Sequence, residues 1–307
     1  MAGIPQNQKA SELTRDIYYS AKMLDTESRA RGEGPITRKQ LSSALKVTAA
    51  VAKDIEVLLH YGKYVGTTEN EIAIVKKALV ISDIHIPYHD DEALEVALHA
   101  AEAAKVDTIV LLGDVLDFYR ISHFSKDPRR KSVNVEMEEG RGFLSELRAR
   151  FPKARIVFYR GNHEMRLEKY ICENAPELID ILEGLMQSRL GLHELNIEYV
   201  TEPFRSGKLW MMHGHEKPGG FAAEHIPNVM WKYVHDNCLV GHYHRRQEKI
   251  FKKISGERFW VGALGYLGGP QDYAPLNQWS QGYAIIDFDN SGRFHPHLFE
   301  IVEGKSY

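Results

Sequence analysis

Five short segments of the chain gather side chains that bind divalent metal ions. They are residues 83–85 (DIH), 113–117 (GDVLD), 161–164 (GNHE), 213–215 (HGH) and 241–244 (GHYH). Carboxylate, imidazole and amide oxygen donors suit divalent first-row metals, and because none of these segments contains cysteine, a purely structural zinc site is disfavoured. If the segments meet in one crevice, they hold enough donors for two ions rather than one.

The spacing within the segments favours a shared site. Asp83 and His85 are two residues apart, and alternate side chains of an extended strand end point the same way, so both can bind one ion. A glycine directly precedes each of Asp114, Asn162 and His242. Because glycine permits a sharp turn and a close approach to a ligand, we expect tight turns around the bound ions.

Strands and helices that would position these segments follow from the hydrophobic pattern. Apolar, strand-like runs lead into four of the segments, at residues 78–82, 108–112, 155–159 and 208–212. Helical patterns over residues 91–104 and 133–150 separate the first three runs, and Asp90 and Asp91 are interpreted as caps of the first helix. This order predicts an α/β sheet whose ligands lie beyond the carboxyl ends of its strands.

After the third strand the pattern changes to helical and then to mostly β. Residues 165–190 predict a helical insertion, which is either a cap that selects the substrate or a scaffold. Four later runs have strand character, at residues 248–254, 258–264, 282–289 and 293–301.

The first part of the chain predicts a separate, mainly helical domain over residues 1–75. Glycine and proline at residues 32–35 separate a first helix from a second, for which Thr37 is the predicted N-cap, and Thr48 is the predicted N-cap of a third. Residues 61–75 alternate like a short hairpin. Three helices followed by a hairpin resemble a winged helix-turn-helix.

The third helix of this domain offers little charge for DNA. Lys53 is the only cation within residues 48–59, and Asp54 and Glu56 oppose it. A recognition helix usually presents several Arg, Lys, Asn or Gln side chains to base edges. We therefore consider three alternatives to DNA binding for this domain: packing, a homo-oligomer formed through the N-terminal domain, and contact with another protein.

The composition excludes some classes of protein. The 307 residues include 39 Lys and Arg against 42 Asp and Glu, a formal net charge of −3, which rules out a basic, histone-like nucleic-acid coat and an acidic disordered tail. Cys172 and Cys238 are the only cysteines, so no disulfide framework is expected. We expect no membrane span, no signal-peptide core at the start, no membrane partner and a cytoplasmic location.

In their order and spacing, the motifs DxH, GDxxD, GNHE, HG and GHxH resemble those of the calcineurin-like metallophosphoesterase superfamily, over roughly residues 78–300. The resemblance implies the four-layer αββα sandwich of that superfamily, an α/β fold, for a domain over residues 76–307. It also implies a hydrolase that acts on phosphate esters with two divalent metal ions as cofactors. Manganese is the expected metal, with Fe, Zn, Ni or Mg as alternatives.

The resemblance further implies a role for each motif residue. The metal ligands it implies are Asp83, His85 and His244 for the first ion, Asn162, His213 and His242 for the second, and Asp114 as a bridge between the two. His163 would face the substrate without binding metal, and Asp117 would orient His163 through a hydrogen bond. In this mechanism a hydroxide that bridges the two ions attacks phosphorus in line. His215 is interpreted as a neighbour of the ligands rather than as one of them.

One part of the pattern departs from the serine/threonine phosphatase branch of the superfamily. Residues 160–164 (RGNHE) resemble that branch, but residues 113–120 (GDVLDFYR) lack the arginine that follows the second aspartate there and binds phosphate. The missing arginine argues against a protein phosphatase. Arg166, which begins the helix directly after His163, is the predicted substitute in the site, and Arg120 is the other candidate.

These observations favour phosphodiesters as substrates, in nucleic acid (DNA or RNA) or in a nucleotide. A phosphomonoesterase that acts on nucleotides or phosphoproteins is one alternative, and a non-catalytic module that binds DNA or protein is another. Phe118, Tyr119 and Phe124 are interpreted either as packing residues or as a surface on which a base stacks.

Overall fold

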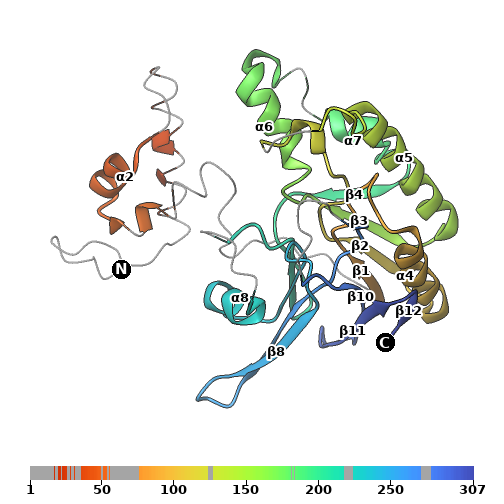
Figure 1. The fold of residues 1–307 in the computed structure, drawn as a ribbon. Helices are drawn as coiled ribbons and strands as arrows, with labels where there is room; N and C mark the ends of the chain where they lie inside the picture. Colours follow the sequence, from red (N-terminus) through yellow and green to blue (C-terminus); the bar gives the residue numbers. More distant parts are fainter. Residues whose placement is uncertain are drawn as a thin grey trace. The chain divides into compact units, whose positions relative to one another are not determined.

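A computed structural model of the chain (Figure 1) describes residues 76–123, 127–180, 182, 184–217, 224–270 and 278–307, and from the first 75 residues it describes 17, 20, 21, 23–25, 28, 31, 36–49, 51–53 and 55. The chain divides into two compact units, residues 1–69 with 216–221 and residues 70–215 with 222–307. The predicted domain limits, 1–75 and 76–307, stay a prediction.

The N-terminal unit contains a helix with a complete cap. Helix α2 (Arg38–Ala44) follows Thr37, whose side chain accepts a hydrogen bond from the Gln40 amide at 3.4 Å, while the Gln40 side chain accepts one from the Thr37 amide at 2.8 Å. This reciprocal capping box confirms Thr37 as the N-cap. Thr48 Oγ1 accepts a hydrogen bond from the Val51 amide at 3.3 Å, in the manner predicted for the next helix.

A small apolar core holds the described part of this unit together. Its buried residues are Ala21, Ile36, Leu41, Val47, Val51, Ala52 and Ile55. The predicted hairpin over residues 61–75 lies outside the described residues. The winged helix-turn-helix therefore stays a prediction.

The larger unit is built on a mixed sheet of seven strands. Three neighbouring parallel strands alternate with two helices, in the order β1 (Lys77–Ile81), α4 (Asp91–Ala104), β2 (Thr108–Leu111), α5 (Val133–Arg150) and β3 (Arg155–Tyr159). This order and both helix ranges are those predicted from the sequence, and Asp90 is the N-cap of α4. The sheet order is β12-β11-β10-β1-β2-β3-β4, completed by β4 (Ile197–Val200), β10 (Gln281–Phe288), β11 (Phe294–Val302) and β12 (Lys305–Ser306).

A second sheet of five strands packs against the first. Its order is β5-β6-β7-β9-β8, formed by β5 (Phe204–Ser206), β6 (Leu209–Met212), β7 (Cys238–Val240), β9 (Arg258–Ala263) and β8 (Gln247–Lys252). Strands β6, β7 and β9 run parallel, and β8 forms an antiparallel edge hairpin with β9. Helix α8 (Ile226–Val234) follows β6 in the chain.

Alternating side chains of the central strands divide the core into two layers. Leu79 and Ile81 of β1 join a cluster with α4 and α5, whereas Ala78 and Val80 join a second cluster that contains residues of both sheets and, through Ile226, of α8. A sheet buried on both faces explains why its strands read as continuous apolar runs. The layers are thus helices, sheet, sheet and helix, which confirms the αββα sandwich (Figure 1).

The predicted insertion is helical, and one end of it belongs to the core. It contains α6 (Met165–Asn174), the short helix η2 (Pro176–Leu178) and α7 (Leu185–Leu190). Met186 and Leu190 of α7 are buried in the same cluster as α5, so this end of the insertion is scaffold. In the described part of the chain, every helix is too short or too polar to cross a membrane.

Candidate metal centre

Parallel strand ends bring the five predicted segments together. The segments after β1, β2 and β3 leave one edge of the seven-stranded sheet, and those after β6 and β7 leave parallel strands of the second sheet. Hydrogen bonds then connect the segments to one another. The Asp83 amide donates to the Gly113 carbonyl at 3.0 Å, the His242 amide to Asp83 Oδ2 at 2.9 Å, and the His163 amide to Asp114 Oδ1 at 2.9 Å.

The backbone of these segments is unusual. Five of the predicted ligands have left-handed φ angles, namely Asp83 (54°), His85 (57°), Asp114 (52°), His242 (69°) and His244 (58°). The prediction that the first two lie on an extended strand end was therefore wrong, since β1 ends before them. L-residues occupy this region at a cost of roughly 1–3 kcal/mol each, and such residues concentrate at functional sites.

Two glycines allow the close approach that the sequence predicts. A Cβ atom on Gly161 would overlap the Asp114 carboxylate, and one on Gly241 would lie 2.8 Å from Asp83 Oδ2. A side chain at either position would thus push a predicted metal-binding carboxylate out of place.

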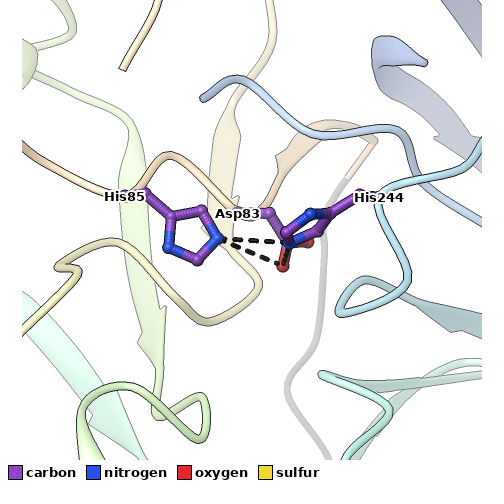
Figure 2. A group of neighbouring side chains, drawn as sticks. All are labelled: Asp83, His85 and His244. Carbon is purple, nitrogen blue, oxygen red and sulfur yellow. Dashed lines mark hydrogen bonds and ion pairs between the residues drawn. The ribbon is translucent and has the colours of Figure 1, made fainter. Parts of the chain in front are cut away.

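The first donor group contains Asp83, His85 and His244 (Figure 2). His244 Nε2 lies 3.2 Å from Asp83 Oδ1 and 3.2 Å from His85 Nε2, and His85 Nε2 lies 3.9 Å from Asp83 Oδ1. Two ligands of one ion, each at about 2.1 Å from it, lie roughly 3.0–3.4 Å apart. The spacing of these donor atoms is therefore close to that of a coordination shell.

The second donor group contains Asp114, His213 and His242, whose donor atoms lie within 4.8 Å of one another. His213 Nε2 lies 3.1 Å from Asp114 Oδ2, and His213 Nδ1 lies 2.8 Å from the Leu112 carbonyl. The carbonyl fixes the proton on Nδ1, so Nε2 presents its lone pair. Asn162 Oδ1 is buried and accepts no hydrogen bond from the described residues.

Asp114 links the two donor groups. Its carboxylate also forms a group with His85 and His163, within the same 4.8 Å limit. The two donor groups are also close at a second point, where His213 Nε2 lies 3.8 Å from Asp83 Oδ1. One carboxylate thus has donors of both groups around it, which is the arrangement that a bridging ligand requires.

The charge states of the buried donor side chains favour the binding of cations. Burial lowers the pKa of His85 to about 3 and that of His242 well below its ordinary value, so both imidazoles are neutral and offer lone pairs. Burial alone would raise the pKa of Asp83, but His213 and His244 hold it below its ordinary value. Asp83 Oδ1 and His85 Nδ1 are buried and have no hydrogen-bond partner among the described residues. Buried carboxylate and neutral imidazole donors without partners fit divalent metal ions.

The three predicted catalytic residues lie together beside these donors. His163 Nδ1 lies 2.8 Å from the Asp117 carbonyl oxygen, and the Asp117 carboxylate is farther, at 3.4 Å. Arg166 donates from Nη1 to the Asp117 carbonyl at 2.8 Å, and its Nη2 lies 2.8 Å from His163 Nε2. The hydrogen bond that orients His163 thus involves mainly the backbone of Asp117. Arg120 is exposed on the helix η1 (Tyr119–Ile121).

Glu164 is a residue whose importance the sequence analysis missed. Its carboxylate is buried and accepts three backbone hydrogen bonds, from Gly161 at 2.8 Å, Asp114 at 3.0 Å and Leu116 at 2.9 Å. It therefore joins the GDVLD and GNHE segments. The available signal was an acidic residue that directly follows two residues of the predicted site, Asn162 and His163.

Glu136 is a second missed residue. Its side chain is fully buried on α5, and Oε2 accepts a hydrogen bond from the Phe118 amide at 2.5 Å. An acidic residue on the apolar face of a predicted helix was the signal in the sequence. Phe118 itself is fully buried, so it is a packing residue, and Phe124 lies outside the described residues.

The chain is similar to several known proteins. Residues 76–281 match the family described as calcineurin-like phosphoesterase. Two relatives, each called "Gene 54 protein", from Mycobacterium phages L5 and D29, are 24% identical over 253 residues, which cover 75% of this chain and 95% of theirs. Among solved structures, a single mutant of Vps29 from Entamoeba histolytica aligns with a TM-score of 0.41 and 14% identity, over 75% of this chain and 96% of that one. YfcE, a phosphoesterase from E. coli, aligns with a TM-score of 0.31 and 16% identity, over 72% and 98%.

Proposed function

The chain belongs to the calcineurin-like phosphoesterase family and is a metal-dependent hydrolase, and from this premise we propose that it is a dinuclear enzyme that cleaves phosphodiesters of nucleotides or nucleic acid. The observation that carries the proposal is the position of Asp114, whose carboxylate lies among the donors of two adjoining groups. A carboxylate shared in this way suits two cations about 3.5–4 Å apart, because it offsets their repulsion.

The proposed ligands are those of the two groups together with one amide. They are Asp83, His85 and His244 for one ion, Asn162, His213 and His242 for the other, and Asp114 for both. Bound divalent ions supply Lewis acidity toward phosphoryl oxygens and lower the pKa of a water molecule. Manganese is the proposed metal, since imidazole and carboxylate donors are mixed in the site.

The neighbouring residues are proposed to bind and orient the phosphate. His163 is anchored through Nδ1 to the Asp117 carbonyl, which leaves Nε2 to face the substrate. Arg166 holds its guanidinium against that same atom at 2.8 Å. A phosphoryl oxygen that replaced this contact would accept a hydrogen bond from the guanidinium, and a second one from Nε2 when His163 is protonated. Burial alone would lower the pKa of His163, but Asp114 and Asp117 raise it above its ordinary value and so favour the protonated form. Both hydrogen bonds would stabilise charge that develops in the transition state.

A diester fits the charge of the site better than a monoester. Arg166 is already partly neutralised, because its Nη1 lies 3.2 Å from Asp117 Oδ1. A dianionic monoester needs more positive charge than a monoanionic diester. The phosphomonoesterase alternative is therefore the less favoured one.

The test is hydrolysis by protein stripped with a chelator and reloaded with Mn²⁺, Fe²⁺, Zn²⁺, Ni²⁺ or Mg²⁺. We expect turnover of bis(p-nitrophenyl) phosphate that depends on the metal and exceeds turnover of p-nitrophenyl phosphate. A preference for the monoester would overturn the proposed substrate class. No turnover of either ester with any metal would support the non-catalytic alternative.

A further inference from the structure

Two aromatic side chains surround the imidazole of His244. Tyr266 lies nearly parallel to it, with ring centroids 5.3 Å apart and an interplanar angle of 16°. Trp279 meets both rings at steep angles, 4.5 Å and 78° from His244 and 5.3 Å and 65° from Tyr266. An indole ring therefore lies directly against a proposed metal ligand.

Backbone hydrogen bonds fix the position of Trp279. The next residue, Ser280, donates from its amide to the His244 carbonyl at 2.9 Å, and its carbonyl accepts from the Tyr266 amide at 3.0 Å. The Ser280 hydroxyl accepts from the Arg246 amide at 2.7 Å. Because the chain beside Trp279 is tied to both of its ring partners, the indole is held in place before any ligand arrives.

Trp279 lies outside the hydrophobic core that the described residues form. Neither Trp279 nor Tyr266 belongs to the two hydrophobic clusters of the larger unit, as far as its residues are described. Tyr266 is 9% exposed and lies along the imidazole, so it suffices to support His244. Trp279 keeps part of its surface in water. A large ring that is left partly exposed beside a reactive centre offers apolar contact area to a ligand.

We infer that Trp279 is a stacking surface for a nucleobase next to the scissile phosphate, so that the substrate is a phosphodiester that carries a nucleoside. The inference rests on the proposed function, because it requires the phosphate to bind beside His244. A base has a flat π-face whatever its identity, so stacking on Trp279 gives affinity for nucleosides without sequence preference. The sequence analysis considered Phe118, Tyr119 and Phe124 for such a surface, as the alternative to a packing role, and did not consider Trp279.

The test compares two diesters that differ only in one base. Thymidylyl-thymidine is matched with an analogue in which one thymine is replaced by hydrogen. The loss of one stacked base lowers affinity by about 5- to 150-fold, so we expect kcat/KM of the protein to fall by a factor in this range for the abasic diester. W279A should abolish the difference between the two substrates, and W279F should retain most of it.

A matched control uses another tryptophan of the same unit. Trp260 packs edge-to-face on Phe294, with ring centroids 5.9 Å apart, and W260A should keep the preference for the base-containing diester. The ratio of the two substrates is the readout, because a general loss of folding or of metal would lower both rates together.

A binding measurement separates this inference from the proposed function. Calorimetry on the Mn²⁺-loaded protein compares thymidine 5′-monophosphate with 2-deoxyribose 5-phosphate. Tighter binding of the nucleotide that W279A abolishes supports the stacking surface, even if no diester is turned over. Equal binding of the two, or equal hydrolysis of the two diesters by the unaltered protein, overturns the stacking surface and leaves the phosphodiesterase proposal intact. Absence of all diester hydrolysis overturns the phosphodiesterase proposal instead.

Discussion

His163 lies beside the proposed metal ligands but is proposed to act on the substrate and not to bind a metal ion. Its Nε2 lies 3.6 Å from Asp114 Oδ2, and its Nδ1 is engaged by the Asp117 carbonyl. The side chain thus stands beside the donor groups while its two ring nitrogens face other partners. We propose that a residue in this position acts on the phosphate, since the proposed ligands are complete without it.

We expect H163A to bind metal like the unaltered protein and to hydrolyse diesters about 10²- to 10⁴-fold more slowly, the usual contribution of a positioned proton donor. Metal content by mass spectrometry and turnover of bis(p-nitrophenyl) phosphate are measured on the same sample. His99, with a side chain that is 70% exposed on α4, supplies the control H99A. Unchanged turnover in H163A would remove His163 from the reaction.

At the scale of elements, Glu164 connects two loops that leave neighbouring strands. The loops after β2 and β3 contain four of the proposed site residues, and the Glu164 carboxylate accepts amide hydrogen bonds from both loops. Truncation leaves three buried amides without their acceptor. Each unsatisfied buried amide lowers the free energy of unfolding by roughly 1–3 kcal/mol. The two loops would also lose their fixed positions relative to each other.

E164A should therefore lower the free energy of unfolding by at least about 3 kcal/mol and weaken metal binding. Denaturant unfolding and metal titration measure the two effects. Glu173, near the other end of α6 and 58% exposed, gives the control E173A, for which we expect almost no change. If E164A unfolded at the same denaturant concentration as E173A, Glu164 would not be the connection between the loops.

Glu136 links helix α5 to the loop that presents Asp117, and it predicts a pH dependence. Burial, with the nearby charge of Asp117 adding to it, raises the pKa of Glu136 from 4.5 to about 8. Between these values the folded protein keeps a proton that the unfolded chain has released. The contribution of Glu136 to the free energy of unfolding is thus present below about pH 4.5 and is lost as the pH rises toward 8.

E136Q should remove this decline, because glutamine keeps an acceptor for the Phe118 amide and carries no charge. Each unit of pKa difference corresponds to about 1.4 kcal/mol, so the variant should be more stable than the unaltered protein by a few kcal/mol above pH 8 and similar to it near pH 5. Unfolding curves at several pH values measure this, with E138Q, exposed on the same helix, as the control. Parallel pH profiles for E136Q and the unaltered protein would disprove the assignment.

At the scale of the whole molecule, the donors come from both sheets. Asp83 and Asp114 follow strands of the seven-stranded sheet, and His213 and His242 follow strands of the five-stranded sheet. Ions bound among them would link the two layers of the sandwich. A ligand that binds only the folded state stabilises it by about 2.7 kcal/mol at a concentration of 100 times its Kd.

Removal of metal by a chelator should therefore lower the Tm by several degrees, and Mn²⁺ should restore it. H85A should show a weaker response, because His85 is a proposed ligand of only one of the two ions, whereas H99A should keep the full response. Thermal scans with and without Mn²⁺ measure the effect. An H85A protein that Mn²⁺ stabilises as fully as it stabilises H99A would exclude His85 from the site.

Much of this architecture could be predicted from the sequence, for a physical reason. Local periodicity of apolar residues predicts a strand over residues 155–159 and helices over 91–104 and 133–150. The structure contains all three elements with the same limits. The same holds for the αββα layers, which the ordered motifs implied. Short strands such as β4 and β7, with four and three residues, carry too little pattern to be recognised.

The finer geometry of the site could not be predicted, because it depends on tertiary contacts. The left-handed backbone of Asp83 and His85 results from the way the segments are hydrogen-bonded to one another, and nothing in the DIH triplet indicates it. The same is true of Glu164, since two of its three amide partners are about 50 residues away in the chain. Trp279 belongs to no motif, and its contact with His244 is a tertiary contact between segments that are distant in the chain.

The most direct test of this account is diffraction from crystals of the protein grown with Mn²⁺, with data collected at the manganese absorption edge. We predict two anomalous peaks about 3.5–4 Å apart, with the Asp114 carboxylate in contact with both and His163 in contact with neither. A single peak, or two peaks that do not share Asp114, would contradict the dinuclear centre from which the proposed chemistry follows.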